Sequence, residues 1–202
     1  MSATRPSDLE PFADDGAAVP LSSTVATTIE EVDEGLDLRS ISRAALVTAA
    51  GLALPIVFHA LRLGQVFLPM YLPILAGAFF LRPRWAAASG AATPLVSAAA
   101  TGRPPLFPPV ALWMAVELGV MAALASLLAR RRWLPAPIAV ASALLVGRLL
   151  YAGLIFATGR WLALPAGLLT VVSLAAGWPG MVLAIVAVPL AVVSLRRAGV
   201  TA

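Results

Sequence analysis

Six apolar segments, separated by arginine, proline and glycine, fill most of the chain after Ile41. They cover residues 43–61, 66–81, 85–101, 108–129, 136–158 and 178–195. A straight helix needs about 20 apolar residues to cross the hydrocarbon core of a bilayer. A mean hydropathy of +0.93 is also far from that of a soluble domain. The pattern predicts an all-α polytopic membrane protein with six transmembrane helices.

A seventh apolar stretch, residues 162–176, precedes the last segment. It is short for a spanning helix and is interrupted by Pro165 and Gly167. We expect it to form a re-entrant or interfacial helix.

Arginine placement predicts the orientation, because positive residues near span ends are retained on the cytoplasmic side. With the N-terminus inside, the inner boundaries carry nine arginines: Arg39, Arg43, Arg82, Arg84, Arg130, Arg131, Arg132, Arg196 and Arg197. The outer loops carry only Arg62, Arg103 and Arg160. Both termini are therefore expected in the cytoplasm, with the chain in a bacterial plasma membrane.

The N-terminal 40 residues differ from the rest of the chain. They hold nine of the ten acidic residues, Asp8, Glu10, Asp14, Asp15, Glu30, Glu31, Asp33, Glu34 and Asp37, among serine, threonine, proline and glycine. This composition predicts a disordered cytoplasmic tail. The expected organisation is thus a tail at 1–40, a six-helix membrane domain at 41–197 and a C-terminal tail at 198–202.

Composition argues against several classes of function. The chain has no cysteine and one histidine, which disfavours a metal cage or thiol chemistry. Its arginines are scattered at segment edges, so we expect no nucleic-acid partner. No phosphate-binding loop or nucleophile elbow occurs, and the apolar segments contain one carboxylate. We expect no enzymatic activity and no cofactor bound by this chain.

Two charged residues interrupt the apolar segments, Glu117 in the fourth and Arg148 in the fifth. A lone charge near mid-bilayer costs at least about 2.5–3.5 kcal/mol, so each needs a partner or a polar cavity. Adjacent helices would allow them to pair. The pair would either hold two helices together or also bind a polar ligand.

Polar and aromatic residues gather near the predicted outer face. The candidates for substrate binding among them are His59, Arg62, Gln65, Phe67, Met70 and Tyr71. Trp113 lies one turn from Glu117 on the same predicted helix, and with Tyr151 it is a candidate for stacking on a flat ring. Arg103 lies in a proline-rich loop, residues 101–109, that suits a lid but is equally compatible with a plain connection. A lone histidine such as His59 is also common as a helix-end residue.

In the first segment Ala45, Ala49 and Ala53 recur every four residues. Such a stripe of small side chains permits close packing of another helix. That helix would belong either to this bundle or to a partner subunit.

Together these features resemble the substrate-binding S component of energy-coupling factor (ECF) vitamin transporters. The closest stretch runs from His59 to Gly119. It contains Gly64, Phe67-Leu68-Pro69-Met70, Pro73, Leu75-Ala76-Gly77, Arg82-Pro83, Gly90, Thr93-Pro94, Ser97, Thr101-Gly102, Pro104-Pro105, Pro108 and Glu117-Leu118. The run Gly177-Trp178-Pro179-Gly180, followed by Pro189, is similar to the start of the family's sixth helix.

The resemblance implies a six-helix subunit that captures a small water-soluble vitamin or related metabolite in an outward pocket. It implies three partners, a membrane T component and two ATPases that use ATP, and it assigns the alanine stripe to the T-component contact. Two positions depart from the family pattern: Tyr71 replaces a frequent histidine, and Arg103 replaces a hydrophobic residue. The substrate is therefore left open among pyridoxine-like, pantothenate-like, pyrimidine, queuosine-precursor and corrinoid ligands.

Two other hypotheses remain at this stage. The chain would be a self-sufficient proton-coupled carrier if Glu117 exchanged protons during transport. It would be a ligand-free structural subunit if Glu117 and Arg148 only joined helices.

Overall fold

The computed structural model describes residues 38–60, 69–107, 109–131, 133–161 and 177–200. These residues form six helices and no strands, which confirms the all-α prediction for this part of the chain. The helices are α2 (Leu38–Ala60), α3 (Tyr71–Ala78), α4 (Pro83–Thr101), α5 (Val110–Ala129), α6 (Ala136–Trp161) and α8 (Trp178–Arg197).

Proline and glycine set several helix ends. Pro83 opens α4, where its missing N–H leaves no helical hydrogen bond unmade. Gly102 closes α4 with a φ of 70°, a left-handed conformation that glycine adopts without strain. Pro109 precedes α5, so the proline-rich loop separates these two helices as predicted.

Five helices coincide with predicted spans, and the second span does not appear at full length. The described helix within residues 66–81 is α3, with eight residues. At 1.5 Å per residue it is about 12 Å long, too short to cross a bilayer by itself. The predicted seventh stretch, 162–176, lies outside the described residues, as does the acidic tail up to residue 37.

Within the described residues, three helices are long and apolar enough to cross a membrane: Val110–Ala129, Ala136–Gly159 and Trp178–Arg197. Their exposed faces carry large apolar side chains at helical spacing, for example Leu112, Val116 and Val120 on α5. Water does not favour such faces, but lipid does. The chain is therefore a membrane protein by the composition and exposure of these helices.

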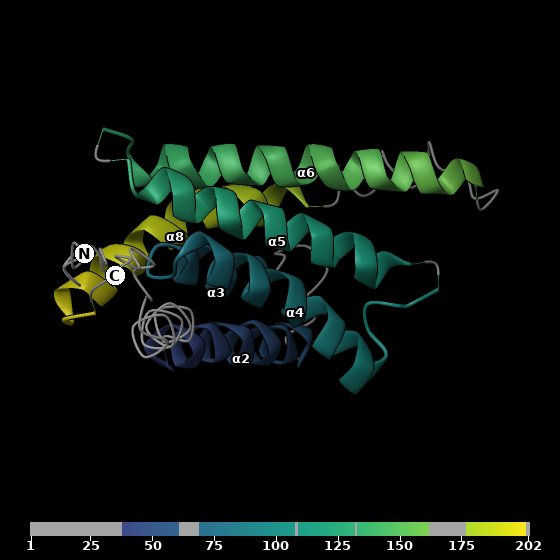
Figure 1. Cartoon of the computed structure of the whole chain (residues 1–202), viewed down its shortest axis with the longest axis horizontal. Helices are drawn as coiled ribbons and strands as arrows, with labels where there is room; N and C mark the ends of the chain where they lie inside the picture. The colour runs from purple at the N-terminus through teal and green to yellow at the C-terminus, as the bar shows by residue number, and fades with distance from the viewer. Residues whose placement is uncertain (1–37, 61–68, 108, 132, 162–176, 201–202) are drawn as a thin grey trace, which may run out of the picture. The chain divides into compact units, whose positions relative to one another are not determined.

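Most arginines of the described helices and connections lie at one end of the bundle. In Figure 1 the start of α2, the α3–α4 and α5–α6 connections and the end of α8 lie at one end of the bundle. These elements carry Arg39, Arg43, Arg82, Arg84, Arg130, Arg131, Arg196 and Arg197. The α4–α5 connection at the opposite end carries Arg103. The arginine asymmetry read from the sequence is thus an asymmetry between the two ends of the folded bundle.

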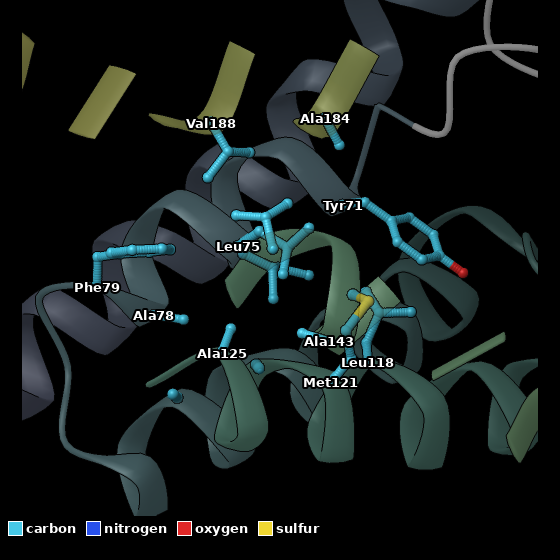
Figure 2. Packing of buried hydrophobic residues seen from close by; sticks show 14 of the residues in the cluster. Tyr71, Leu75, Ala78, Phe79, Leu118, Met121, Ala125, Ala143, Ala184 and Val188 are labelled. Carbon is cyan, nitrogen blue, oxygen red and sulfur yellow. The ribbon is translucent and has the colours of Figure 1, made fainter. Parts of the chain in front are cut away.

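The core lies where α3 packs between α2, α4, α5 and α8 (Figure 2). Leu75 of α3, Leu118 of α5 and Val188 of α8 are almost completely buried there. At the arginine-rich end, Ser126 Oγ of α5 donates a hydrogen bond of 2.6 Å to the carbonyl oxygen of Leu81. Arg130 Nη2 lies 3.4 Å from the same oxygen, so the α3–α4 turn is fastened to α5.

Helix α5 packs on α4 and α6 through glycine. A Cβ atom on Gly90 of α4 would lie 2.5 Å from the carbonyl oxygen of Leu118 in α5. A Cβ atom on Gly147 of α6 would lie 3.2 Å from Met121 Cβ, also in α5. Small residues at these two seams let the backbones approach closely.

Candidate functional site

Glu117 and Arg148 are the only buried charged residues in the described part of the chain. Glu117 is on α5, seven residues after Val110, and Arg148 is on α6. Gly147, next to Arg148, brings α6 close to Met121, one turn after Glu117. The close approach of these helices therefore places the two charges opposite each other.

The ion pair expected from the sequence is confirmed. Arg148 Nε lies 3.5 Å from Glu117 Oε1, with 7% of the Arg148 side chain and 0% of the Glu117 side chain exposed. This separation is longer than the 2.7–2.9 Å or so of a charge-assisted hydrogen bond. Neither Arg148 Nε nor Glu117 Oε1 has a hydrogen-bond partner among the described residues. The pair is thus held by charge attraction without a well-made hydrogen bond.

Tyr71 joins this pair from α3, where it is the first residue of the helix. Its hydroxyl donates a hydrogen bond of 2.7 Å to Glu117 Oε2. Figure 2 shows its ring at the edge of the core, with the hydroxyl pointing away from Leu75 and Val188. The buried carboxylate therefore has different neighbours at its two oxygens, a phenol at Oε2 and a guanidinium at Oε1.

Two aromatic rings surround the guanidinium. Arg148 Cζ lies 4.9 Å from the centroid of the Tyr71 ring and 5.9 Å from that of Tyr151. Both distances are within the range of cation–π attraction, which is strongest for a desolvated cation. We call Tyr71, Glu117, Arg148 and Tyr151 the buried tetrad. Three helices, α3, α5 and α6, contribute to it.

A small apolar cluster adjoins the tetrad through Tyr151. It consists of Trp113, Tyr151 and Ile155, with Val110, Met114 and Leu154 packed against it. Trp113 is one turn before Glu117, as the sequence indicated. Ile155 was not anticipated, although its position one turn after Tyr151 on α6 is a signal that places both on one face.

The other predicted site residues do not join the tetrad in the described part of the chain. Met70 is buried in the main core. Arg103 is exposed in the α4–α5 loop, where its carbonyl oxygen accepts a hydrogen bond of 2.7 Å from Ser97 Oγ. His59 lies in the last turn of α2, but its side chain is outside the described structure, as are Arg62, Gln65 and Phe67.

The alanine stripe lies on an open face. Ala45, Ala49 and Ala53 are exposed on α2, whereas their neighbour Ala44 is buried. The stripe is thus not used for packing among the described helices. Its assignment to a T-component contact stays a prediction.

Chemically, the tetrad combines a carboxylate, a guanidinium and two phenols within one buried region. The described residues contain no group of three histidine, cysteine, aspartate or glutamate side chains that would hold a metal ion. Donors, an acceptor and aromatic rings are the usual means by which a protein orients a small polar molecule. Scans against protein-family models, curated proteins and solved structures gave no match to this chain.

Proposed function

We propose that this chain is a membrane substrate-binding subunit that captures a small water-soluble vitamin or related metabolite. The observation that carries this proposal is the buried tetrad. Keeping two charges inside an apolar bundle is expensive, and a well-packed apolar pair would stabilise the bundle at least as well. Recognition of a polar ligand gives a reason to keep them.

The resemblance to ECF S components supports the same function and adds partners. Glu117 belongs to the family-like motifs in the stretch from His59 to Gly119, whereas Tyr71, in the same stretch, departs from the family pattern. In this proposal a T component and two ATPases energise uptake with ATP. The chain itself binds its substrate and catalyses no reaction.

The proposed topology has six membrane crossings, with both termini in the cytoplasm of a bacterial cell. The arginine-rich end of the bundle supports this orientation, because arginines are retained on the cytoplasmic side. The α4–α5 loop would then face outward and the α5–α6 connection inward.

This orientation can be tested by labelling, because the chain has no cysteine of its own. Leu106 in the α4–α5 loop and Trp133 in the α5–α6 connection are 61% and 77% exposed. In intact cells we expect a membrane-impermeant maleimide to modify Leu106→Cys and to modify Trp133→Cys only after permeabilisation. Neither substitution removes an arginine, so the orientation signal is unchanged. Labelling of Trp133→Cys alone in intact cells would show the opposite orientation.

Function can be tested with the purified chain and the small molecules that co-purify with it, which mass spectrometry identifies. We expect one of them to bind again after removal and to stabilise the protein against heat. In liposomes that contain this chain alone, the radiolabelled compound should bind without accumulating inside. Accumulation driven by a proton gradient would instead identify a proton-coupled carrier. Absence of any bound or stabilising compound would favour a structural subunit.

A further inference from the structure

We propose that the ligand binds Arg148 and Glu117 together, through a hydrogen-bond acceptor and donor that lie side by side on a flat molecule without net charge. Cyclic amides and carboxamides have this arrangement, and so do zwitterions. This inference rests on the proposed function and specifies the class of substrate.

The donor side of the site is one edge of the Arg148 guanidinium. Nε and Nη2 point along the same edge and form a two-donor fork that matches an oxygen acceptor. Both nitrogens are buried and lack a hydrogen-bond partner among the described residues, in a side chain that is 7% exposed. A buried donor without an acceptor costs about 1–3 kcal/mol, so a ligand oxygen here would recover free energy.

The acceptor side is Glu117 Oε1. The other carboxylate oxygen already accepts the Tyr71 hydroxyl, whereas Oε1 is buried without a hydrogen bond. Oε1 lies 3.5 Å from Arg148 Nε, so the free acceptor and the free donor edge are neighbours. A ligand that presents an oxygen to Arg148 and an N–H or O–H to Glu117 would satisfy both.

Charge balance restricts the ligand further. Glu117 and Arg148 already neutralise each other in a region of low dielectric constant. An anion bound to the guanidinium would lie next to the Glu117 carboxylate. Two neighbouring negative charges repel strongly where the effective dielectric constant is low. A cation at the carboxylate would meet Arg148 in the same way. A neutral or zwitterionic ligand adds no uncompensated charge.

The shape follows from the aromatic residues beside the pair. Tyr71 and Tyr151 flank the guanidinium, and Trp113 packs with Tyr151. Aromatic side chains favour flat ring systems by stacking and edge-to-face contact. Among the ligands left open by the sequence, pyrimidine-like and queuosine-precursor-like cyclic amides fit, whereas an acyclic anion such as pantothenate does not.

The test uses the full chain in detergent and two matched pairs of probes, together with the compound extracted from the protein. Uracil and orotate share a ring and differ by a carboxylate, and nicotinamide and nicotinate differ as carboxamide and carboxylate. We expect the tightest binder in thermal-shift and calorimetric titrations to be neutral or zwitterionic. Whichever of uracil and nicotinamide binds, its carboxylate counterpart, orotate or nicotinate, should bind at least about tenfold more weakly, equivalent to 1.4 kcal/mol or more.

Two variants connect this selectivity to the site. Glu117→Gln keeps an oxygen for the Tyr71 hydroxyl, and the double variant Glu117→Gln/Arg148→Met removes both charges together. We expect each to weaken binding of the preferred ligand at least about tenfold, equivalent to 1.4 kcal/mol. Arg196→Gln, at an exposed position in the last turn of α8, should leave binding unchanged.

The outcomes separate this inference from the proposed function. If the tightest ligand carries a net negative charge, the inference is wrong and the proposed function stands. Unchanged binding by the double variant would also overturn the inference alone, because the ligand would then lie elsewhere. If neither the extracted material nor any probe binds, the proposed function is wrong and the inference fails with it.

Discussion

Arg148→Met is expected to lower the free energy of unfolding by about 3–5 kcal/mol, the usual cost of removing one partner of a buried ion pair. The reason is that Glu117 is fully buried, so without a cation nearby its carboxylate must either stay charged in an apolar environment or take up a proton, and both cost free energy. Tyr71 would still donate its hydrogen bond to Oε2, but a single phenol does not replace a guanidinium. The loss can be measured by equilibrium unfolding in mixed micelles with an increasing fraction of SDS.

The double variant Glu117→Gln/Arg148→Met should recover most of this loss. The glutamine side chain retains an acceptor for the Tyr71 hydroxyl, and methionine fills much of the arginine volume without charge. Arg196→Met at an exposed position is the control and should change stability by less than about 0.5 kcal/mol. A double variant no more stable than Arg148→Met would show that the charge pair does not explain the loss.

This recovery also separates structure from function. If the pair only joins α5 and α6, the recovered double variant should support transport as well as the original chain. If the pair binds ligand, the same variant should be folded and unable to bind.

The second large effect is expected at the α4–α5 seam. In Gly90→Ala the new Cβ atom would lie 2.5 Å from the Leu118 carbonyl oxygen and 2.8 Å from its carbonyl carbon. Both are backbone atoms of α5, so no side-chain rotation relieves the contact and the helices must separate. We expect a loss of about 1–3 kcal/mol or more, measured in the same SDS titration.

The matched control is Gly153→Ala on α6, where a Cβ atom would meet nothing within 4 Å. This change should be neutral or stabilise the protein by up to about 1 kcal/mol, because alanine is the better helix former. Equal stability of the two variants would contradict the close α4–α5 packing. Gly90→Ala should also weaken ligand binding, since Leu118 adjoins Glu117 on the helix that would move.

The apolar segments predicted the helices well because long runs of apolar residues have few alternatives in lipid. Helices α4, α5 and α8 begin and end within a few residues of segments 85–101, 108–129 and 178–195. The exception is α3, where Pro69 and Pro73 lie in the segment and the described helix starts only at Tyr71. The average hydropathy of a segment shows that it is apolar, but it does not show at which residue the helix begins.

The site was predictable only in part. Glu117 and Arg148 were recognisable because an isolated charge inside an apolar segment must find a partner. The hydrogen bond from Tyr71 was not, because it joins residues 46 positions apart and no local spacing relates α3 to α5. Arg103 was included in the predicted site because it lies in a proline-rich loop, and it is exposed in that loop, so its role in binding stays a prediction.

The fastening of the Leu81 carbonyl to Ser126 has a mechanical consequence when it is combined with the Tyr71 hydroxyl bond. Helix α3 is hydrogen-bonded to α5 near both of its ends, so these two helices should move together as a rigid body. Helix α6 is held to that body at the buried charges by a 3.5 Å contact without a hydrogen bond. If a ligand is to reach the buried charges, we expect α6 to separate from α5 while α3 stays attached to α5.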